Sequence, residues 1–408
     1  MSEHATIIPH LFRTEYRKIV SVLCRHFGFR ELEIAEDIAS ETFLVAMQAW
    51  GLEGLPPNPA GWLYTTAKNK AKNYLQRESV FQDKISKGLQ NNDRQDIGEE
   101  IDLSLQNIND SQLQMMFAIC HPAISREAQI GLSLRILCGF GIEEIATAFM
   151  TTREVINKRL FRAKDKLREE QVQIELPPAA EIDARLEQVL TTIYLLFNEG
   201  YYSVSQNHTL KKELCLEAMR LCTMLIENPE TNKPQVNALL ALMCFHASRF
   251  DARTNADGAI ILYDEQDSSL WNTDLISKGG YFLNMAAQGN KLSRYHLEAG
   301  IAAWHTQQYD SPEKWEAILH LYNQLLQREY SPVAALNRTY AVAKVKGKQA
   351  AIAEAEKLNL PENRFYHSLL GELYGGLDDE KANVHWQTAL SLTKTDADKE
   401  AIRRKLKK

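Results

Sequence analysis

The sequence predicts an all-α protein, and three observations support that prediction. Apolar residues recur at helical spacing along most of the chain, as in the amphipathic segment 9–27. Alternating Val, Ile and Thr at strand spacing is scarce. Short turns rich in Gly, Pro and Asn separate the helical segments. At 408 residues the chain is long for one domain and suggests two or three.

Composition and cysteine usage exclude several classes of protein. The chain is 45% hydrophobic and 25% charged with a net charge of −6, an ordinary soluble composition. It has no apolar run long enough to span a bilayer and no signal-peptide pattern, so we expect a cytoplasmic protein without membrane contact. The six cysteines lie far apart without a C-x-x-C pair, which favours buried reduced thiols over disulfides or a zinc site. Nucleotide-binding, zinc-protease and hydrolase motifs are missing, so we expect no cofactor, no metal and no catalysis.

The second predicted helix, 31–50, ending at Gly51, combines an apolar side with an acidic side. Its apolar residues are expected to pack inward and its acidic residues to lie exposed. The apolar set is Ile34, Ile38, Phe43, Leu44, Met47 and Trp50, and the acidic set is Glu36, Asp37 and Glu41. Such a surface suits a partner with a basic or coiled-coil surface. The alternative is an ordinary amphipathic helix.

The third predicted helix, 60–77, follows a linker rich in Gly and Pro that ends the preceding helix. It interleaves basic residues with amides and aromatics: Trp62, Tyr64, Lys68, Asn69, Lys70, Lys72, Asn73 and Arg77. Cations follow phosphates and aromatic faces stack on unpaired bases, so this pattern favours melted or single-stranded DNA. Trp62 could equally belong to the core. Residues 79–110 are polar, with few apolar anchors, and are expected to form a mobile linker.

Residues 111–170 are expected to form a helical bundle that ends in a helix-turn-helix. The first helix of that motif is predicted over 142–149, with a turn at Met150 and Thr151 and an N-cap at Thr151 or Thr152. The second helix is expected to bury Val155, Ile156, Leu160, Ala163 and Leu167. Its other face carries Arg153, Asn157, Lys158, Arg159, Arg162, Lys164 and Lys166. A basic island in an acidic protein favours insertion of this helix into the DNA major groove. A solvated basic helix is the alternative.

Paired prolines at 177–178 predict a second domain boundary, and the pattern of helical segments changes after it. From 179 to 408, helical segments recur with small residues at close-packing points and a spacing of about 34 residues, which suggests a tetratricopeptide-like (TPR-like) solenoid. An irregular helical domain is the alternative. Asp264, Glu265 and Asp267 suggest either a metal or general-base site or a capped, solvated turn.

The ordered motifs AEDIASETFLVAMQAW, PAGWLYTTAKNKAKNYLQRE and the helix-turn-helix resemble sigma-70-type initiation factors of the extracytoplasmic-function class, over about residues 9–170. The resemblance implies region 2 over 9–78, a linker over 79–110 and region 4 over 111–170. It also implies promoter DNA and bacterial core RNA polymerase, with its clamp coiled coil and flap, as partners.

The same resemblance assigns roles to individual residues. It implies that Asp37, Glu41, Phe43 and Trp50 bind the polymerase. For the −10 element it implies Trp62, Lys68, Asn69, Lys72, Asn73 and Arg77. For the −35 element it implies Thr152, Arg153, Asn157, Lys158, Arg159, Arg162 and Lys166. Asn73 and Gln76 depart from the charged residues frequent in the family, so the −10 preference stays open.

The C-terminal half narrows the resemblance. The motifs at 194–203, 240–249, 261–272 and 335–347 resemble the group that carries a C-terminal TPR-like domain. This implies that residues 179–408 regulate activity in place of a separate anti-sigma protein, through contact with the DNA-binding half or the polymerase. Two other functions stay open. One is a helix-turn-helix repressor or activator. The other is an enzyme in 179–408, which requires convergent carboxylates in a cleft at 263–271.

Overall fold

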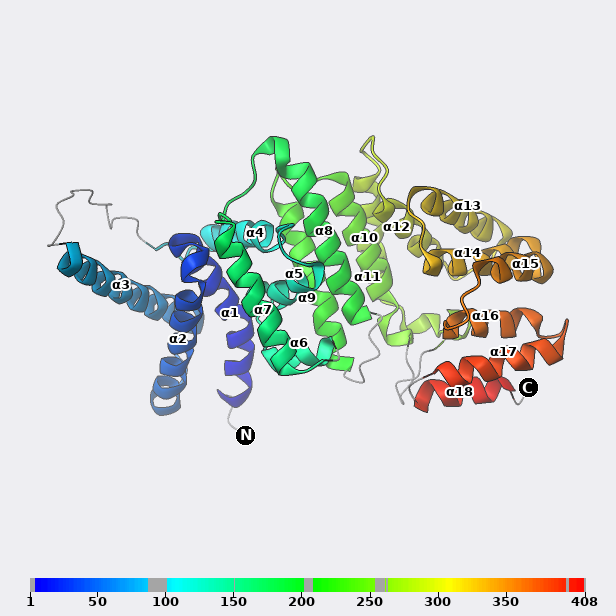
Figure 1. Cartoon of the computed structure of the whole chain (residues 1–408), viewed down its shortest axis with the longest axis horizontal. Helices are drawn as coiled ribbons and strands as arrows, with labels where there is room; N and C mark the ends of the chain where they lie inside the picture. The colour runs from blue at the N-terminus through cyan, green and yellow to red at the C-terminus, as the bar shows by residue number, and fades with distance from the viewer. Residues whose placement is uncertain are drawn as a thin grey trace. The chain divides into compact units, whose positions relative to one another are not determined.

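The computed structural model describes residues 4–86, 101–149, 151–201, 208–253, 261, 263–393 and 396–406. Within these residues the chain forms 18 α-helices and a few short 3₁₀ or π turns, and no strand (Figure 1). The all-α prediction is confirmed. None of the helices in the described ranges is long and apolar enough to cross a membrane.

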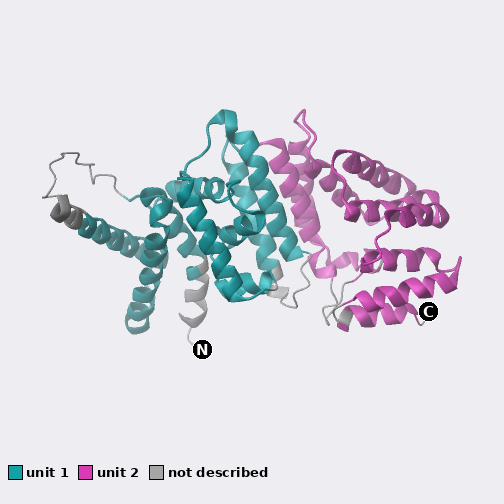
Figure 2. Cartoon of the chain, viewed as in Figure 1, with its two compact units in different colours: residues 1–231 teal, residues 232–408 magenta. Residues whose placement is uncertain are grey.

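The chain divides into two compact units, residues 1–231 and 232–408 (Figure 2). The first unit contains α1 (His4–Phe27), η1 (Phe29–Glu31), α2 (Leu32–Glu53), α3 (Pro59–Ser86), α4 (Leu105–Ile119), α5 (Arg126–Leu132), η2 (Ser133–Leu137), α6 (Ile142–Ala148), α7 (Arg153–Glu169), α8 (Ala179–Tyr201) and α9 (His208–Glu227). The second contains α10 (Pro234–Ser248), η3 (Phe250–Ala252), η4 (Tyr263–Glu265), η5 (Ser268–Leu270), α11 (Thr273–Ala286), α12 (Arg294–His305), α13 (Pro312–Arg328), α14 (Pro332–Lys346), α15 (Lys348–Leu358), α16 (Arg364–Tyr374), α17 (Asp379–Leu392) and α18 (Asp396–Leu406).

Several predicted boundaries move in the structure. Helix α2 continues past Gly51 and ends at Gly54, whose φ of 86° suits glycine as a helix stop. Helix α3 runs on to Ser86, and α4 begins at Leu105, so helices occupy both ends of the linker predicted at 79–110. Residues 87–100 of that linker lie outside the described residues, as does Met150 in the predicted turn.

The first unit extends beyond the boundary predicted at the paired prolines. Helices α8 and α9 pack against each other, and both contact α4. Their buried faces carry residues such as Leu186, Ile193 and Leu221, each no more than 1% exposed. Burying one such side chain contributes about 1.5–3 kcal/mol. The compact unit that holds α1–α7 therefore ends at Thr231 and includes the first two helices of the segment predicted at 179–408.

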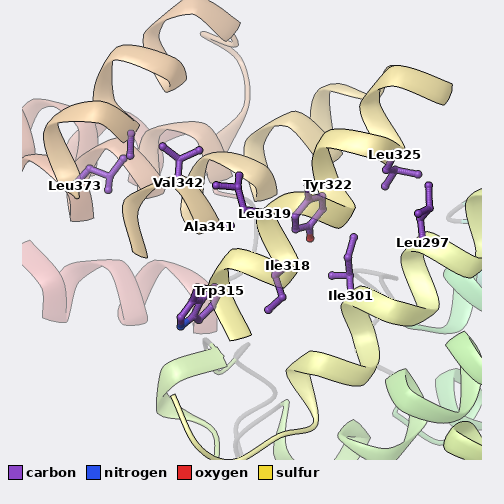
Figure 3. Packing of buried hydrophobic residues seen from close by; sticks show 11 residues of the cluster. Leu297, Ile301, Trp315, Ile318, Leu319, Tyr322, Leu325, Ala341, Val342 and Leu373 are labelled. Atoms are coloured by element: carbon purple, nitrogen blue, oxygen red, sulfur yellow. The ribbon is translucent and has the colours of Figure 1, made fainter. Parts of the chain in front are cut away.

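The second unit is built from successive helices that pack on one another, as α12 on α13, α13 on α14 and α16 on α17. Figure 3 shows its main core, to which α12, α13, α14 and α16 contribute: Leu297, Ile301, Trp315, Ile318, Leu319, Tyr322, Leu325, Ala341, Val342 and Leu373. Small residues permit close approach, since a Cβ added at Gly371 would lie 2.7 Å from the ring of Trp386. This pairing of neighbours is compatible with a TPR-like solenoid, which stays a prediction.

All six cysteines are buried and unbridged, as the sequence predicts: Cys24, Cys120, Cys138, Cys215, Cys222 and Cys244. Burial raises the pKa of the Cys120 thiol to about 11 and those of Cys138 and Cys244 to about 12. These sulfurs therefore stay protonated and unreactive at neutral pH in the folded chain.

Candidate functional site

One face of α2 presents acidic and apolar side chains to solvent. Asp37 and Glu41 are exposed, as predicted, and Leu44 and Gln48 follow them at the i+3 and i+4 spacing that places all four on one stripe. Glu41 forms an ion pair with Lys70 of α3 at 2.8 Å. Because both side chains remain partly exposed, this pair contributes little stability and can exchange for another partner.

The contact role predicted for two apolar residues of α2, Phe43 and Trp50, is corrected by their burial, whereas their predicted inward packing is confirmed. Phe43 and Trp50 are each only 2% exposed. Phe43 packs edge-on against Phe12, and Trp50 packs edge-on against Trp62. Both side chains thus belong to the core and cannot serve as contact residues in this fold.

Two other apolar residues of α2 take their place on the surface. Leu44 is 58% exposed and Met47 is 54% exposed, although both were predicted to pack inward. The physical reason is that α1 and α3 cover only one side of α2. Leu44 follows Phe43 by one residue, a turn of about 100°, and so lies outside that contact. An apolar residue next to exposed acids at i+3 was the signal for Leu44 in the sequence.

Helix α3 presents a polar face opposite its buried side. Asn69, Lys72, Asn73 and Arg77 are all exposed, whereas Leu63, Ala67 and Ala71 are fully buried. Two residues predicted for this face lie apart from it. Trp62 is half-buried against Trp50, and Lys68 is half-buried beside residues 101–104, where it helps to line a pocket of about 320 Å³. The structure thus gathers four of the six predicted residues on one surface.

Helices α6 and α7 form the two helices predicted around the turn at 150–151. The hydroxyl of Thr152 caps α7 by accepting a hydrogen bond from the amide of Val155, at 3.4 Å. Burial of Ile156, Leu160, Ala163 and Leu167 is confirmed. Val155 is 43% exposed, so its predicted burial is wrong. It lies about 100° from Ile156 on the helix, outside the side that α5 and α6 cover.

The outer face of α7 is basic and largely exposed. The exposed residues are Thr152, Arg153, Asn157, Lys158, Arg162 and Lys166. Arg159 is half-buried, with its guanidinium over the ring of Phe149. Arg153 and Lys166 form exposed ion pairs with acids on α6 and on α7 itself. Phe161, 59% exposed between Lys158 and Arg162, was missed because the sequence pattern treats aromatics as core.

The remaining basic residues of α7 face α2. The ammonium of Lys164 lies 2.5 Å from a carboxylate oxygen of Glu36, which Arg135 also approaches at 3.6 Å. Arg168 pairs with Glu33 at 3.0 Å. We call these residues, Glu33, Glu36, Arg135, Lys164 and Arg168, the α2–α7 ion-pair cluster. Glu36 was predicted to be exposed and Lys164 to lie on the free basic face, yet each side chain is less than 15% exposed.

Helix α9 adds a second set of ion pairs to the same unit. Glu217 accepts hydrogen bonds from Arg17 of α1 at 2.6 Å and from Arg220 at 2.7 Å. Arg220 also donates to the backbone carbonyl of Leu137 at 2.7 Å. Burial alone would raise the pKa of Glu217, but Arg220 and Arg17 outweigh it and lower that pKa below its usual value. Helix α9 therefore connects α1 with the chain between α5 and α6.

The described side chains of the segment 263–271 do not form a cleft with convergent carboxylates. Asp267 is exposed and caps η5 by accepting from the amide of Ser269 at 2.9 Å. Glu265 is exposed and pairs with Lys405 at 3.2 Å. The side chain of Asp264 lies outside the described residues. In the described part of the chain, no group of three His, Cys, Asp or Glu side chains is arranged to hold a metal. The arrangement at Asp267 is that of a capped turn.

Comparison with known proteins gives matches over both parts of the chain. Residues 11–80 match Sigma-70 region 2, and residues 185–287 match a family of unknown function (DUF6596). The first match covers most of α1, all of α2 and most of α3. An uncharacterized protein of Rhizobium meliloti (strain 1021) is 31% identical over 387 residues, which cover 93% of this chain and 90% of that protein. No solved structure matches the chain.

Proposed function

Because this chain belongs to the same family as the Rhizobium meliloti protein and carries a sigma-70 region 2 domain, we propose that it is a sigma factor that directs core RNA polymerase to specific promoters. The observation that carries the proposal is the region 2 match over α1–α3, since those helices present the two surfaces such a factor needs. The order of the motifs further supports assignment to the extracytoplasmic-function class.

The polymerase would bind the exposed stripe of α2. Asp37 and Glu41 offer negative charge, and Leu44 and Met47 offer apolar area beside it. Acidic side chains next to exposed apolar groups complement a basic coiled coil, because the charges orient the partner and the apolar groups supply buried area. Phe43 and Trp50 hold the helix in place from inside.

Promoter DNA would be bound by two helices. The Asn and Lys side chains of α3 suit an unpaired −10 strand, because amides can bond base edges and cations follow phosphates. The basic face of α7, centred on Lys158 and Arg162, suits the −35 major groove after the capped turn at Thr152. Phe161 and Asn157 lie on the exposed part of this helix, where they could reach base edges and thymine methyl groups.

We further propose that the C-terminal segment regulates these surfaces. Helices α8 and α9 belong to the same compact unit as α1–α7, and Glu217 and Arg220 connect two parts of that unit. A displacement of α9 would therefore alter its contacts with Arg17 of α1 and with the backbone at Leu137, which precedes α6. The second unit, 232–408, would act as a TPR-like platform for such a signal.

The test is binding of the full-length protein to bacterial core RNA polymerase. The variant Asp37→Arg/Glu41→Arg should reduce affinity by at least tenfold, because two attractive charges become repulsive. The matched control is Asp183→Arg/Glu187→Arg, which reverses two exposed acids at the same spacing on α8. The control should bind as the wild type does.

Three results would decide the matter. Loss in the α2 variant alone supports docking through α2. Equal loss in both variants means that net charge, and not the α2 stripe, governs binding, and the docking surface is then wrong. If the wild-type chain does not bind core polymerase but does bind duplex DNA, the sigma-factor proposal fails and a helix-turn-helix repressor or activator replaces it.

A further inference from the structure

The second unit contains two histidines that are hydrogen-bonded to each other. His367 of α16 and His385 of α17 approach with their Nδ1 atoms 3.0 Å apart, and the two helices lie side by side (Figure 1). The two rings are tilted by 33°, with their centres 5.2 Å apart. Such a bond forms only if one Nδ1 carries a hydrogen and the other does not. The proposed promoter-binding function leaves this pair without a role.

A further contact assigns the hydrogens of the neutral pair. Nε2 of His367 lies 2.9 Å from the backbone carbonyl oxygen of Pro361, which can only accept. Nε2 of His367 therefore carries a hydrogen, and a neutral imidazole carries only one. Nδ1 of His367 is then the acceptor, and Nδ1 of His385 is the donor. This arrangement satisfies both hydrogen bonds while both rings are neutral.

Aromatic rings of α16 enclose the pair. His367 is only 8% exposed, and His385 is half-buried. Tyr374 stacks on His385 with ring centres 5.7 Å apart, and Tyr366 meets His367 edge-on at 5.2 Å. The Tyr374 hydroxyl donates to the carboxylate of Glu356 at 2.6 Å, which holds that ring in place. Both tyrosines belong to a core shared by α14, α15, α16 and α17, so separation of the imidazoles disturbs that core.

The first and the second added proton affect the pair differently. The first can bind Nε2 of His385, because Nδ1 of that ring then still donates to His367. The second must bind Nδ1 of His367, because Nε2 of His367 already carries a hydrogen. Two N–H groups on two positively charged rings would then face each other across 3.0 Å. The folded pair therefore accommodates one added proton but not two.

The charges around the pair do not remove this limit. Burial lowers the pKa of His385 most, and the neighbouring His367 lowers it further. Glu356 of α15 raises that pKa, and Lys381 of α17 lowers it, so these two charges oppose each other. Three further charged side chains on the surrounding helices have partners of opposite charge: Arg338 of α14 with Glu354, Arg364 of α16 with Asp398, and Glu372 of α16 with Lys405.

We propose that the His367–His385 pair makes the α16–α17 helix pair sensitive to pH, so that the helices are closed at neutral pH and open as the pH falls below about 6.5. Once the helices have opened, the two imidazoles are apart and each binds a proton near pH 6.5, as a free side chain does. The open form therefore binds about one proton more than the closed form in acid, and acid favours opening. This device is independent of promoter recognition.

The sign of the effect follows from the neutral rings. A histidine whose folded pKa is lowered stabilises the fold in its neutral form. That contribution is complete above about pH 6.5 and is lost as the pH falls below it. Uptake of one proton raises the opening constant by up to about tenfold per pH unit in this range.

The experiment is hydrogen–deuterium exchange of the full-length protein at pH 7.5 and pH 5.5, followed in peptides from α16 and α17. His385→Asn keeps an N–H donor near the position of Nδ1 but cannot take up a proton. Wild type and variant are compared at the same pH, so that the intrinsic exchange rate cancels. The protection of the wild type relative to His385→Asn should fall about fivefold to tenfold between the two pH values.

A matched control separates the pair from the other histidines of the unit. His320 is an exposed residue of α13 that is hydrogen-bonded to Gln324 at 2.8 Å. His320→Asn should therefore show the same pH dependence as the wild type. Should His385→Asn not fold, His367→Asn takes its place, because its side-chain carbonyl offers an acceptor near the position of Nδ1.

The outcomes are distinct. Loss of the pH dependence in the folded pair variant, with His320→Asn unchanged, supports the proposal. A wild type whose protection falls no more than that of the pair variant would overturn it. An NMR titration of the wild type would also overturn it if both rings became protonated while the amides of α16 and α17 kept their protection.

Discussion

The α2–α7 ion-pair cluster predicts a measurable coupling between two positions 128 residues apart in the chain. Replacing Glu36 by Gln keeps the shape of the side chain and removes the charge that Lys164 and Arg135 share. Lys164 then keeps a partly buried ammonium without its nearest carboxylate. We therefore expect Glu36→Gln to destabilise the first unit and to weaken the contact between α2 and α7.

The exposure of the Glu36 and Lys164 side chains sets the expected loss of unfolding free energy. The side chains of Glu36 and Lys164 are 14% and 13% exposed. Exposed ion pairs contribute about 0.2–1 kcal/mol, whereas breaking a fully buried pair costs about 3–5 kcal/mol. A value of about 2 kcal/mol is expected for this intermediate burial. For a unit of this size it corresponds to a fall in unfolding temperature of about 4–8 °C.

The assay is a double-mutant cycle by urea unfolding, with Glu36→Gln, Lys164→Met and the double variant. The coupling free energy should be about 1–2 kcal/mol. Lys166→Met is the matched control, because Lys166 pairs locally, with Glu169 in the last turn of α7 and with Glu170 just after it. Its coupling to Glu36→Gln should be close to zero. A Glu36–Lys164 coupling below about 0.3 kcal/mol would refute the reasoning, since independent sites add within that margin.

Three further outcomes are expected. Arg162→Ala should weaken promoter binding and lower the salt slope of log K by about one unit, measured by fluorescence anisotropy at several salt concentrations; an unchanged slope would remove it from the phosphate contacts. Thr152→Ala should cost about 1 kcal/mol in urea unfolding by removing the cap on Val155, and no loss would mean that the cap is not formed. The folded pKa of Glu217 lies below 4.5, so its ionised form stabilises the fold above that pH and loses the contribution as pH falls through the folded pKa. The stability gap between wild type and Glu217→Gln should thus be full at pH 7 and shrink below about pH 4.5; a gap that is the same at pH 7 and pH 3 would contradict the ion pair with Arg17.

The sequence was sufficient to predict the fold class and most of the buried side of α7. Periodicity placed Ile156 and Leu160 inside correctly. It failed at Leu44 and Val155, because the pattern defines a broad apolar side but not how much of that side a neighbouring helix covers. The covered part of α2 depends on how α1 and α3 cross it, and the covered part of α7 depends on how α5 and α6 cross it. These crossing geometries are set only when the whole unit folds.

The same limit applies to the charged residues of the candidate site. The sequence identifies the basic surface of α7 but cannot assign its members to separate tasks. Lys158 remains exposed, whereas Lys164, six residues later, forms a largely buried ion pair with Glu36. Local spacing contains no information on a partner so distant in the chain.

The buried cysteine thiols can be used to measure local opening of the folded chain. A maleimide or a similar reagent attacks the thiolate, so each cysteine should react only when the surrounding helices separate. Cys24 and Cys138 would report opening of the first unit, and Cys244 would report opening of the second. Mass spectrometry of alkylated peptides could then measure the opening rates of both units in a single unmodified sample. Core polymerase and promoter DNA would each reveal the unit on which they act by the cysteines that they protect from alkylation.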